Sequence, residues 1–195
     1  WFRGGTGLAV QKDLDPAASR GARSINEWFM KLKQLTLHNM ASIEDASIDF
    51  EADPLVHSEV FLISGKTGSG KSTLLDAICL ALYDDTPRMR NLKMEGKFDE
   101  VKDSLSIKDP RQLMRQHTGE AYVKLSFEGN DGVTYEAQWS VARARKRENA
   151  KLQDRQWSLL NGRTGQLLTK VQEVKAAIQA AVGLDFGQFC RTTLL

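Results

Sequence analysis

The chain has 195 residues, of which 41% are hydrophobic and 27% are charged, as in folded domains with a single core. A net charge of +2 does not by itself indicate a nucleic-acid or membrane partner, because basic residues must gather on one face to attract either. Two distant cysteines, Cys79 and Cys190, lack the spacing of a disulfide framework or metal site. The sequence also contains no membrane-spanning or secretory segment, and together these features favour a cytoplasmic protein.

The first 29 residues differ in character from the rest. They have no clear hydrophobic period, they mix charge with glycine and alanine, and they precede the first methionine, Met30. We expect residues 1–29 to be a vector-derived or otherwise non-native extension; the alternative is a native extension that packs on the domain. The domain itself is expected over residues 30–195.

Two strands are predicted at the start of this domain. In "MKLKQLTLHN" (residues 30–39) apolar and polar residues alternate, but the alternation slips by one residue around Gln34. A strand with a β-bulge accounts for the slip. The segment "ASIDF" (46–50) alternates without a slip, so the pair predicts the edge of a half-exposed sheet that ends before Pro54.

The next element is a short apolar run, "VFLI" (60–63), which predicts a strand covered on both faces. A glycine-rich loop follows it directly. Residues 74–82 then leave almost no polar face, so the helix after the loop should be buried. Asp84, Asp85 and Pro87 are expected to end this helix.

The second half of the chain predicts an antiparallel hairpin and a helix. Residues 88–118 form a long charged excursion, after which two alternating segments flank the turn "EGNDG" (128–132). A basic segment precedes a further strand, "QWSLL" (156–160), and Trp139 and Trp157 are expected to pack in the core. A helix is predicted over 170–182, with Thr169 and Gln172 as a capping box and Gly183 as its end.

The glycine-rich loop "GKTGSGKS" (65–72) matches the pattern G-x-x-x-x-G-K-[ST] at every fixed position. Its glycines allow the backbone to fold into a nest of N–H donors, which together with a helix N-terminus can hold the α- and β-phosphates of a nucleotide. Lys71 would reach the β- and γ-phosphates, and the Ser72 hydroxyl would bind Mg²⁺. The predicted binding residues for ATP and Mg²⁺ are Gly65, Lys66, Thr67, Gly68, Ser69, Gly70, Lys71, Ser72 and Thr73.

The loop alone does not predict turnover. Hydrolysis needs a second acidic residue at a strand end to hold Mg²⁺ and a group that activates the attacking water. The strands predicted downstream of the loop end in Gly, Arg or Asn rather than in Asp or Asp-Glu. The sequence therefore predicts nucleotide binding with the catalytic half missing.

The segment "GKTGSGKSTLLDAICLALYDDTPR" (65–88) resembles the N-terminal ATPase segment of the SbcC family, ABC-type ATPases of the SMC class. Further similar segments follow in the family's order: the opening "MKLKQLTLHNMASI", then "LMRQHTGEAYVKLSFE" and "YEAQWSVARARKRENAKLQ" in its β-lobe, and "VGLDFGQFCRTTLL" before its Q-loop. The resemblance implies an α/β P-loop fold: an ABC-type N-terminal half-head with a mixed sheet and an antiparallel β-lobe. Residues 30–195 would end just before the Q-loop glutamine.

The resemblance also implies a split ATPase. A long coiled coil would separate this half from a C-terminal half that carries the signature motif, the second acidic motif and the catalytic glutamate. ATP would join two such heads, and the cycle would control access of the partner nuclease SbcD to DNA ends in double-strand break repair and hairpin cleavage. The turn of Asn39, Met40, Ala41 and Ser42 would contact the adenosine, although plain loop geometry also explains it.

Four basic residues form the strongest local positive charge: Arg143, Arg145, Lys146 and Arg147. Exposed basic residues need no function, so a solvated loop explains them. The sharper alternative is contact with DNA phosphates, which basic clusters of this kind make.

Two other classes of function remain open at this stage. A self-contained P-loop phosphotransferase, such as a nucleotide kinase, could use residues 111–115 ("RQLMR") as its lid, but two strands are expected before the loop and the final apolar run has no stop signal. A non-catalytic scaffold stabilised by nucleotide is the other.

Overall fold

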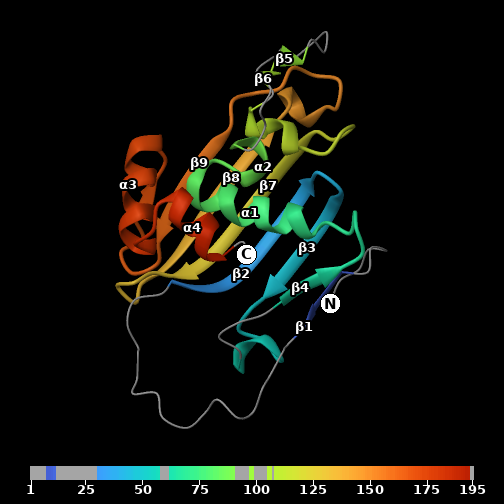
Figure 1. Ribbon diagram of the computed structural model, residues 1–195. Helices are drawn as coiled ribbons and strands as arrows, with labels where there is room; N and C mark the ends of the chain where they lie inside the picture. Colours follow the sequence, from blue (N-terminus) through green and yellow to red (C-terminus); the bar gives the residue numbers. More distant parts are fainter. Residues whose placement is uncertain are drawn as a thin grey trace, which may run out of the picture.

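The computed structural model describes residues 8–11, 30–57, 62–90, 97–98, 105–106 and 108–193. Its main feature is a six-stranded sheet in the order β10-β9-β8-β7-β2-β3, with helices on one face (Figure 1). The strands of this sheet are β2 (Lys31–Met40), β3 (Ile43–Asp49), β7 (Glu120–Glu128), β8 (Thr134–Ala142), β9 (Gln156–Asn161) and β10 (Leu167–Leu168).

The first two strands form as the sequence predicts. β2 pairs with β3 on one side and β7 on the other, and its register against β7 shifts between Leu32 and Gln34. This is the predicted bulge. It brings Leu35 and Leu37 onto the buried face, although strict alternation counted from Leu32 would place them on the opposite face.

The predicted hairpin is also confirmed. β7 and β8 pair in continuous register from Glu120–Ala142 to Glu128–Thr134, and the turn at residues 129–132 is closed by the Gly129 N–H, which donates to the Val133 carbonyl. Trp139 and Trp157 are buried, as expected. Every strand pairing among the described residues is antiparallel, so the parallel strands of the expected mixed sheet are not among them.

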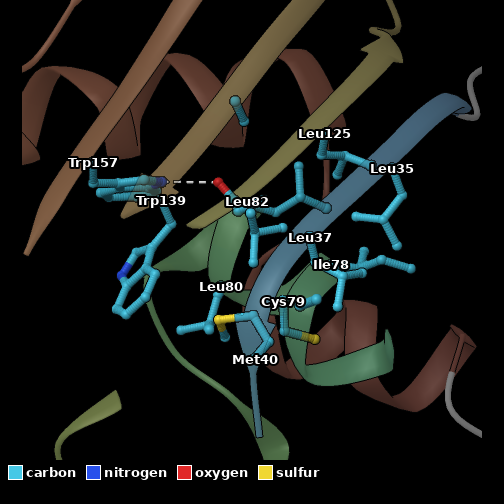
Figure 2. Close-up of a cluster of buried hydrophobic side chains, with 14 of the residues drawn as sticks. Leu35, Leu37, Met40, Ile78, Cys79, Leu80, Leu82, Leu125, Trp139 and Trp157 are labelled. Atoms are coloured by element: carbon cyan, nitrogen blue, oxygen red, sulfur yellow. Dashed lines mark hydrogen bonds between the residues drawn. The ribbon is translucent and has the colours of Figure 1, made fainter. Parts of the chain in front are cut away.

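Helix α1 (Lys71–Tyr83) lies across the sheet and supplies the centre of the core. Figure 2 shows its apolar side chains meeting those of β2, β7, β8 and β9. The Trp157 indole N–H donates to the Ala81 carbonyl at 2.8 Å, which fixes the helix over β9. The labelled members of this cluster are Leu35, Leu37, Met40, Ile78, Cys79, Leu80, Leu82, Leu125, Trp139 and Trp157.

The end of α1 is held by a carboxylate. Asp84 follows the helix in left-handed conformation, at φ 55°, and accepts a hydrogen bond from the Trp139 indole at 2.8 Å. The Arg155 guanidinium forms an ion pair with the same carboxylate. Asp84 therefore ends the helix, as predicted, and also ties it to the strands beneath.

Strand β4 (Leu62–Gly65) departs from its prediction. It pairs with β1 (Leu8–Gln11) and with no other described strand, and 54% of Leu62 is exposed. The prediction of a strand covered on both faces is therefore wrong for the described residues of β4, because Leu62 is exposed and Ile63 is only half-buried. Residues 58–61, which include Val60, lie outside the described residues.

The last two helices differ from prediction in their caps. α3 (Val171–Val182) has Lys170 as its N-cap, with no side-chain capping bond, so the predicted box of Thr169 and Gln172 is wrong: Thr169 lies one residue outside the cap. α4 (Phe186–Thr193) was not predicted, yet it has a reciprocal cap. The Gln188 N–H donates to the Asp185 carboxylate at 2.8 Å, and the Asp185 N–H donates to the Gln188 side chain at 2.9 Å.

The remaining elements are short: η2 (Leu55–His57), α2 (Pro87–Arg90), β5 (Lys97–Phe98), β6 (Leu105–Ser106), η3 (Pro110–Leu113) and η4 (Ala144–Lys146). None of the described helices is both long enough and apolar enough to cross a bilayer.

Candidate nucleotide site

The glycine-rich loop joins a strand to a helix, as the motif requires. β4 ends at Gly65, and α1 begins at Lys71 with Gly70 as its N-cap. The Ser69 N–H donates to the Lys66 carbonyl at 3.1 Å, which closes the loop on itself. The backbone N–H groups of the loop and of the first helical turn can therefore converge on one anion.

Glycine is needed at two positions of the loop. Gly68 and Gly70 have φ angles of 82° and 96°, which side chains disfavour. A Cβ atom at Gly70 would also lie 3.0 Å from the Ile43 Cδ1 atom, whereas a Cβ at Gly68 would meet nothing within 4 Å. Position 70 thus combines a conformational requirement with a steric one.

The lysine of the motif points back into the loop. Its ammonium donates to the Gly65 carbonyl at 2.6 Å and to the Lys66 carbonyl at 2.9 Å. Ser69 is buried, and its hydroxyl has no hydrogen-bond partner among the described residues. A positive charge and an unpartnered polar group inside a concave loop fit a bound phosphate group.

The two hydroxyl residues that follow are placed differently. The Ser72 side chain is exposed in the first turn of α1, where it can reach a metal ion bound to the phosphates. Only 4% of Thr73 is exposed, so its side chain packs beneath the loop. Lys66 and Thr67 are exposed.

The turn between β2 and β3 lies beside the loop, although it is 28 residues away in sequence. The Ser42 hydroxyl oxygen is 3.6 Å from the position that a Cβ at Gly70 would take. Met40 is buried and faces the core, and the Asn39 amide donates to the Glu120 carbonyl at 3.0 Å. Of the four residues predicted to contact adenosine, Ala41 and Ser42 are therefore the ones whose side chains remain available.

Arg115 is a further member of this site, which the sequence indicated only as part of residues 111–115, the lid of the phosphotransferase alternative. Its guanidinium donates to the Ser42 carbonyl at 3.0 Å, and its backbone N–H donates to the Asn39 carbonyl at 2.8 Å. The Ala41 N–H donates to the Leu113 carbonyl at 2.7 Å. These bonds hold a cation at the edge of the phosphate loop. The sequence did not place Arg115 beside the β2–β3 turn, because tertiary hydrogen bonds bring it there.

The segment that carries Arg115 is anchored by a carboxylate. Asp109 caps η3 by accepting from the Arg111 N–H at 2.9 Å, and its side chain also pairs with the Arg111 guanidinium at 2.7 Å. Partial burial raises the pKa of Asp109, but the hydrogen bonds and charge of Arg111 outweigh it and hold this pKa below its usual value.

A second carboxylate lies within α1. Asp76 is buried and pairs with the Arg88 guanidinium at 2.7 Å, which links α1 to α2. Burial raises the pKa of Asp76, and Arg88 offsets part of that rise. Because it sits within a helix beneath the loop, Asp76 does not supply the acidic residue that the sequence lacked at a strand end.

The four basic residues 143–147 do not act as one patch. The Arg143 guanidinium is turned inward to the Ala150 carbonyl at 2.9 Å, and the Lys146 ammonium pairs with the Glu120 carboxylate at 2.7 Å. Arg145 and Arg147 are exposed and form no ion pair with another described residue. The charge available to a partner therefore comes mainly from these two arginines.

No group of three or more His, Cys, Asp or Glu side chains suited to a metal ion occurs within the described ranges. The two cysteines are free, with Cys79 buried and Cys190 half-buried.

Comparison with known proteins identifies relatives of this chain. Residues 34–189 match the family model described as an AAA domain. The chain is 38% identical over 169 residues to the SbcC component of the nuclease SbcCD from Pseudomonas aeruginosa, a match that covers 85% of this chain and 14% of that protein. It is 37% identical over 172 residues to the protein of the same name from Rhodobacter capsulatus, with the same coverage of both.

A solved structure, titled "Structure of the recombination mediator protein RecF-ATP in RecFOR pathway", aligns with a TM-score of 0.46 at 15% identity, over 78% of this chain and 31% of that one. The chain spans about one seventh of the length of the two SbcC relatives. The match over residues 34–189, together with the strand, P-loop and helix described above, places the chain in the AAA domain family of ATPases, with the N-terminal ATPase segment of SbcC as the protein segment that it resembles.

Proposed function

We propose that this chain binds Mg²⁺-ATP as the N-terminal half of an SbcC-type ATPase head. The observation that carries the proposal is the Lys71 ammonium, held inside a glycine loop between β4 and α1. The loop backbone and Lys71 would hold the phosphates, and Ser72 would bind the metal ion. Bound Mg²⁺ would neutralise charge on the phosphates.

The nucleoside would lie toward the β2–β3 turn. Ala41 and Ser42 border the phosphate loop, and Arg115 is bonded to the Ser42 carbonyl. An arginine can contact either a phosphate or the face of a base. Arg115 would therefore contribute to ATP affinity directly and by fixing the turn.

The remainder of the active site would come from a second segment. Leu62, at the start of the strand before the loop, is 54% exposed, and a second segment would bury its side chain. We infer that the C-terminal half of the same head covers this surface and supplies the second acidic residue and the catalytic glutamate. A second head would complete the site by binding the same nucleotide across an ATP-dependent dimer.

In this proposal ATP acts on DNA indirectly. Two relatives are named as the SbcC component of the nuclease SbcCD, and the exposed arginines of the basic segment could contact DNA phosphates. ATP would favour the dimer of the two heads, and hydrolysis would let the heads separate. This cycle would gate the access of the SbcD nuclease to DNA ends. Strand cleavage would belong to SbcD.

Phosphate release tests the split-site proposal. The chain is incubated with Mg²⁺-ATP alone, and then with the C-terminal ATPase segment of an SbcC relative. We expect no sustained release from the chain alone and turnover after the second segment is added. Sustained release by the chain alone, or phosphate transfer to an added nucleoside monophosphate, would contradict the proposal and favour a self-contained phosphotransferase.

A further inference from the structure

The turn that borders the phosphate loop has a backbone conformation that its own residues do not favour. Asn39 and Ala41 have φ angles of 52° and 47°, in the left-handed region that residues with side chains rarely adopt. Such a backbone persists only where neighbouring contacts fix it, and it is concentrated at ligand sites. The contacts that fix this turn therefore bear on the nucleotide site that it borders.

One segment, residues 113–115, supplies contacts to this turn. Leu113 and Met114 are buried, but apolar burial is not directional, so the orientation of the Arg115 side chain depends on polar contacts. The position of the segment therefore decides where the Arg115 guanidinium lies. Each of its three residues bonds to or pairs with the turn: Leu113 with Ala41, Met114 with Met40, and Arg115 with Asn39 and Ser42.

Arg111, two residues before this segment, is held on both sides of its guanidinium group. Its Nε atom donates to both Asp109 carboxylate oxygens at 3.1 Å, and one terminal nitrogen donates to the Asp109 Oδ2 atom at 2.7 Å. The other terminal nitrogen donates at 3.3 Å to the Gln153 carbonyl and at 3.3 Å to the Asp154 carboxylate. A planar guanidinium can bridge two such partners in a fixed geometry, which an ammonium group cannot do. We refer to these bonds as the Arg111 clamp.

The clamp is attached to a well-anchored part of the fold. The Gln153 N–H donates to the carbonyl of Ala142, the last residue of β8, at 2.9 Å. The Arg155 guanidinium forms an ion pair with Asp84 at the end of α1. Only 20% of the Arg111 side chain is exposed, so it is largely shielded from the solvent that weakens surface ion pairs. The clamp thus joins segment 113–115 to both the sheet and α1.

We propose that Arg111 is a positioning residue of the nucleotide site: its clamp sets the position of segment 113–115 and so holds the Arg115 guanidinium against the β2–β3 turn. Arg111 acts through Arg115 and does not need to touch the nucleotide. This inference rests on the proposed binding of Mg²⁺-ATP. It adds that ATP affinity depends on the connection between β8 and β9, which is far from the phosphate loop in sequence.

A double-mutant cycle in ATP affinity tests this inference. Calorimetry measures Mg²⁺-ATP binding to the unmodified chain, Arg111→Ala, Arg115→Ala and the double variant. Arg111→Lys is a milder change that carries the cycle if Arg111→Ala does not fold. Arg90→Ala is the matched control, because Arg90 also pairs with an aspartate, Asp85, at 2.7 Å, but at the opposite end of α1 from the phosphate loop. Urea denaturation gives the free energy of unfolding of each variant, and affinities are compared under conditions where every variant is folded.

We expect Arg111→Ala to weaken ATP binding at least about threefold, which corresponds to the loss of a typical hydrogen bond. When Arg115 is already alanine, the same substitution should weaken binding by no more than about 1.5-fold, because the group that Arg111 positions is absent. Arg111→Lys should bind ATP nearly as weakly as Arg111→Ala, since lysine keeps the charge but cannot bridge Asp109 and the Gln153 carbonyl. Arg90→Ala should keep the affinity of the unmodified chain.

Equal losses from Arg111→Ala with and without Arg115 would overturn the inference, because Arg111 would then act independently of Arg115. Full affinity in Arg111→Lys would also overturn it, since charge alone would suffice. A lower free energy of unfolding with unchanged ATP affinity would leave Arg111 a purely structural role and overturn this inference alone. Absence of ATP binding by the unmodified chain would instead overturn the proposed function on which the inference rests.

Discussion

Replacement of the two positive-φ glycines of the phosphate loop by alanine separates backbone strain from steric conflict. Both Gly68→Ala and Gly70→Ala force a side chain into left-handed conformation, which costs about 1–2 kcal/mol. Both also reduce the freedom of the unfolded chain, which returns about 0.4–1 kcal/mol. These two terms are shared, so they cancel when the variants are compared.

The steric term differs. The new Cβ at position 70 would lie 3.0 Å from the Cδ1 and 3.1 Å from the Cγ1 of Ile43, while the Cβ at position 68 meets open space. Pushing a packed side chain aside costs about 1–3 kcal/mol. We therefore expect Gly70→Ala to be less stable than Gly68→Ala by about 1 kcal/mol, the lower end of this range, since the buried Ile43 side chain must shift by only a few tenths of an ångström.

Urea denaturation followed by far-UV circular dichroism measures this difference, with both variants and the unmodified chain under the same conditions. Equal destabilisation by the two substitutions would refute the reasoning, because it would mean that Ile43 yields without cost. The control adds Ile43→Val to Gly70→Ala. Because this substitution removes the Cδ1 methyl, it should recover part of the stability that the steric contact costs.

Three further predictions concern residues around the site. Arg115→Ala should weaken ATP binding at least about fivefold in calorimetry. Arg115→Lys should have an affinity between those of Arg115→Ala and the unmodified chain, because lysine keeps the charge but loses the guanidinium bond to the Ser42 carbonyl. Asp109→Asn should lower the free energy of unfolding at neutral pH; since the folded pKa of Asp109 lies below its unfolded value, that difference should disappear in urea titrations as pH falls through the folded pKa. Trp157→Phe should destabilise the chain by about 1–3 kcal/mol in the same assay, because the buried Ala81 carbonyl loses its donor.

Local sequence patterns predicted those parts of the fold that local physics controls. The slip in alternation near Gln34 gave the bulge of β2, and two alternating segments around a glycine-rich turn gave the β7–β8 hairpin. Helix α1 was recognisable because residues 74–82 are apolar except for Asp76 and a strict motif precedes them. Each of these signals lies within about 20 residues of sequence.

Features set by tertiary contacts were not predictable in this way. The apolar run before the loop predicted a strand covered on both faces, but burial depends on neighbours that the run does not encode, and Leu62 is exposed. Arg115 joins the site through backbone pairing with Asn39, which no spacing rule anticipates. The capping signal was assigned to the wrong helix: Asp185 and Gln188 had the same pattern as the pair predicted for α3.

Equilibrium binding of Mg²⁺-ATP to three forms of the chain tests the central claim most directly: the unmodified protein, Lys71→Ala and Lys66→Ala. Both variants lose one lysine from the same loop, but only the Lys71 ammonium lies within the loop, while Lys66 is exposed. The account predicts that Lys71→Ala weakens binding at least about tenfold, as expected for loss of a charged partner, and that Lys66→Ala stays close to the unmodified protein. Equal affinities in all three, or equal losses in both variants, would contradict the claim that this loop holds the nucleotide.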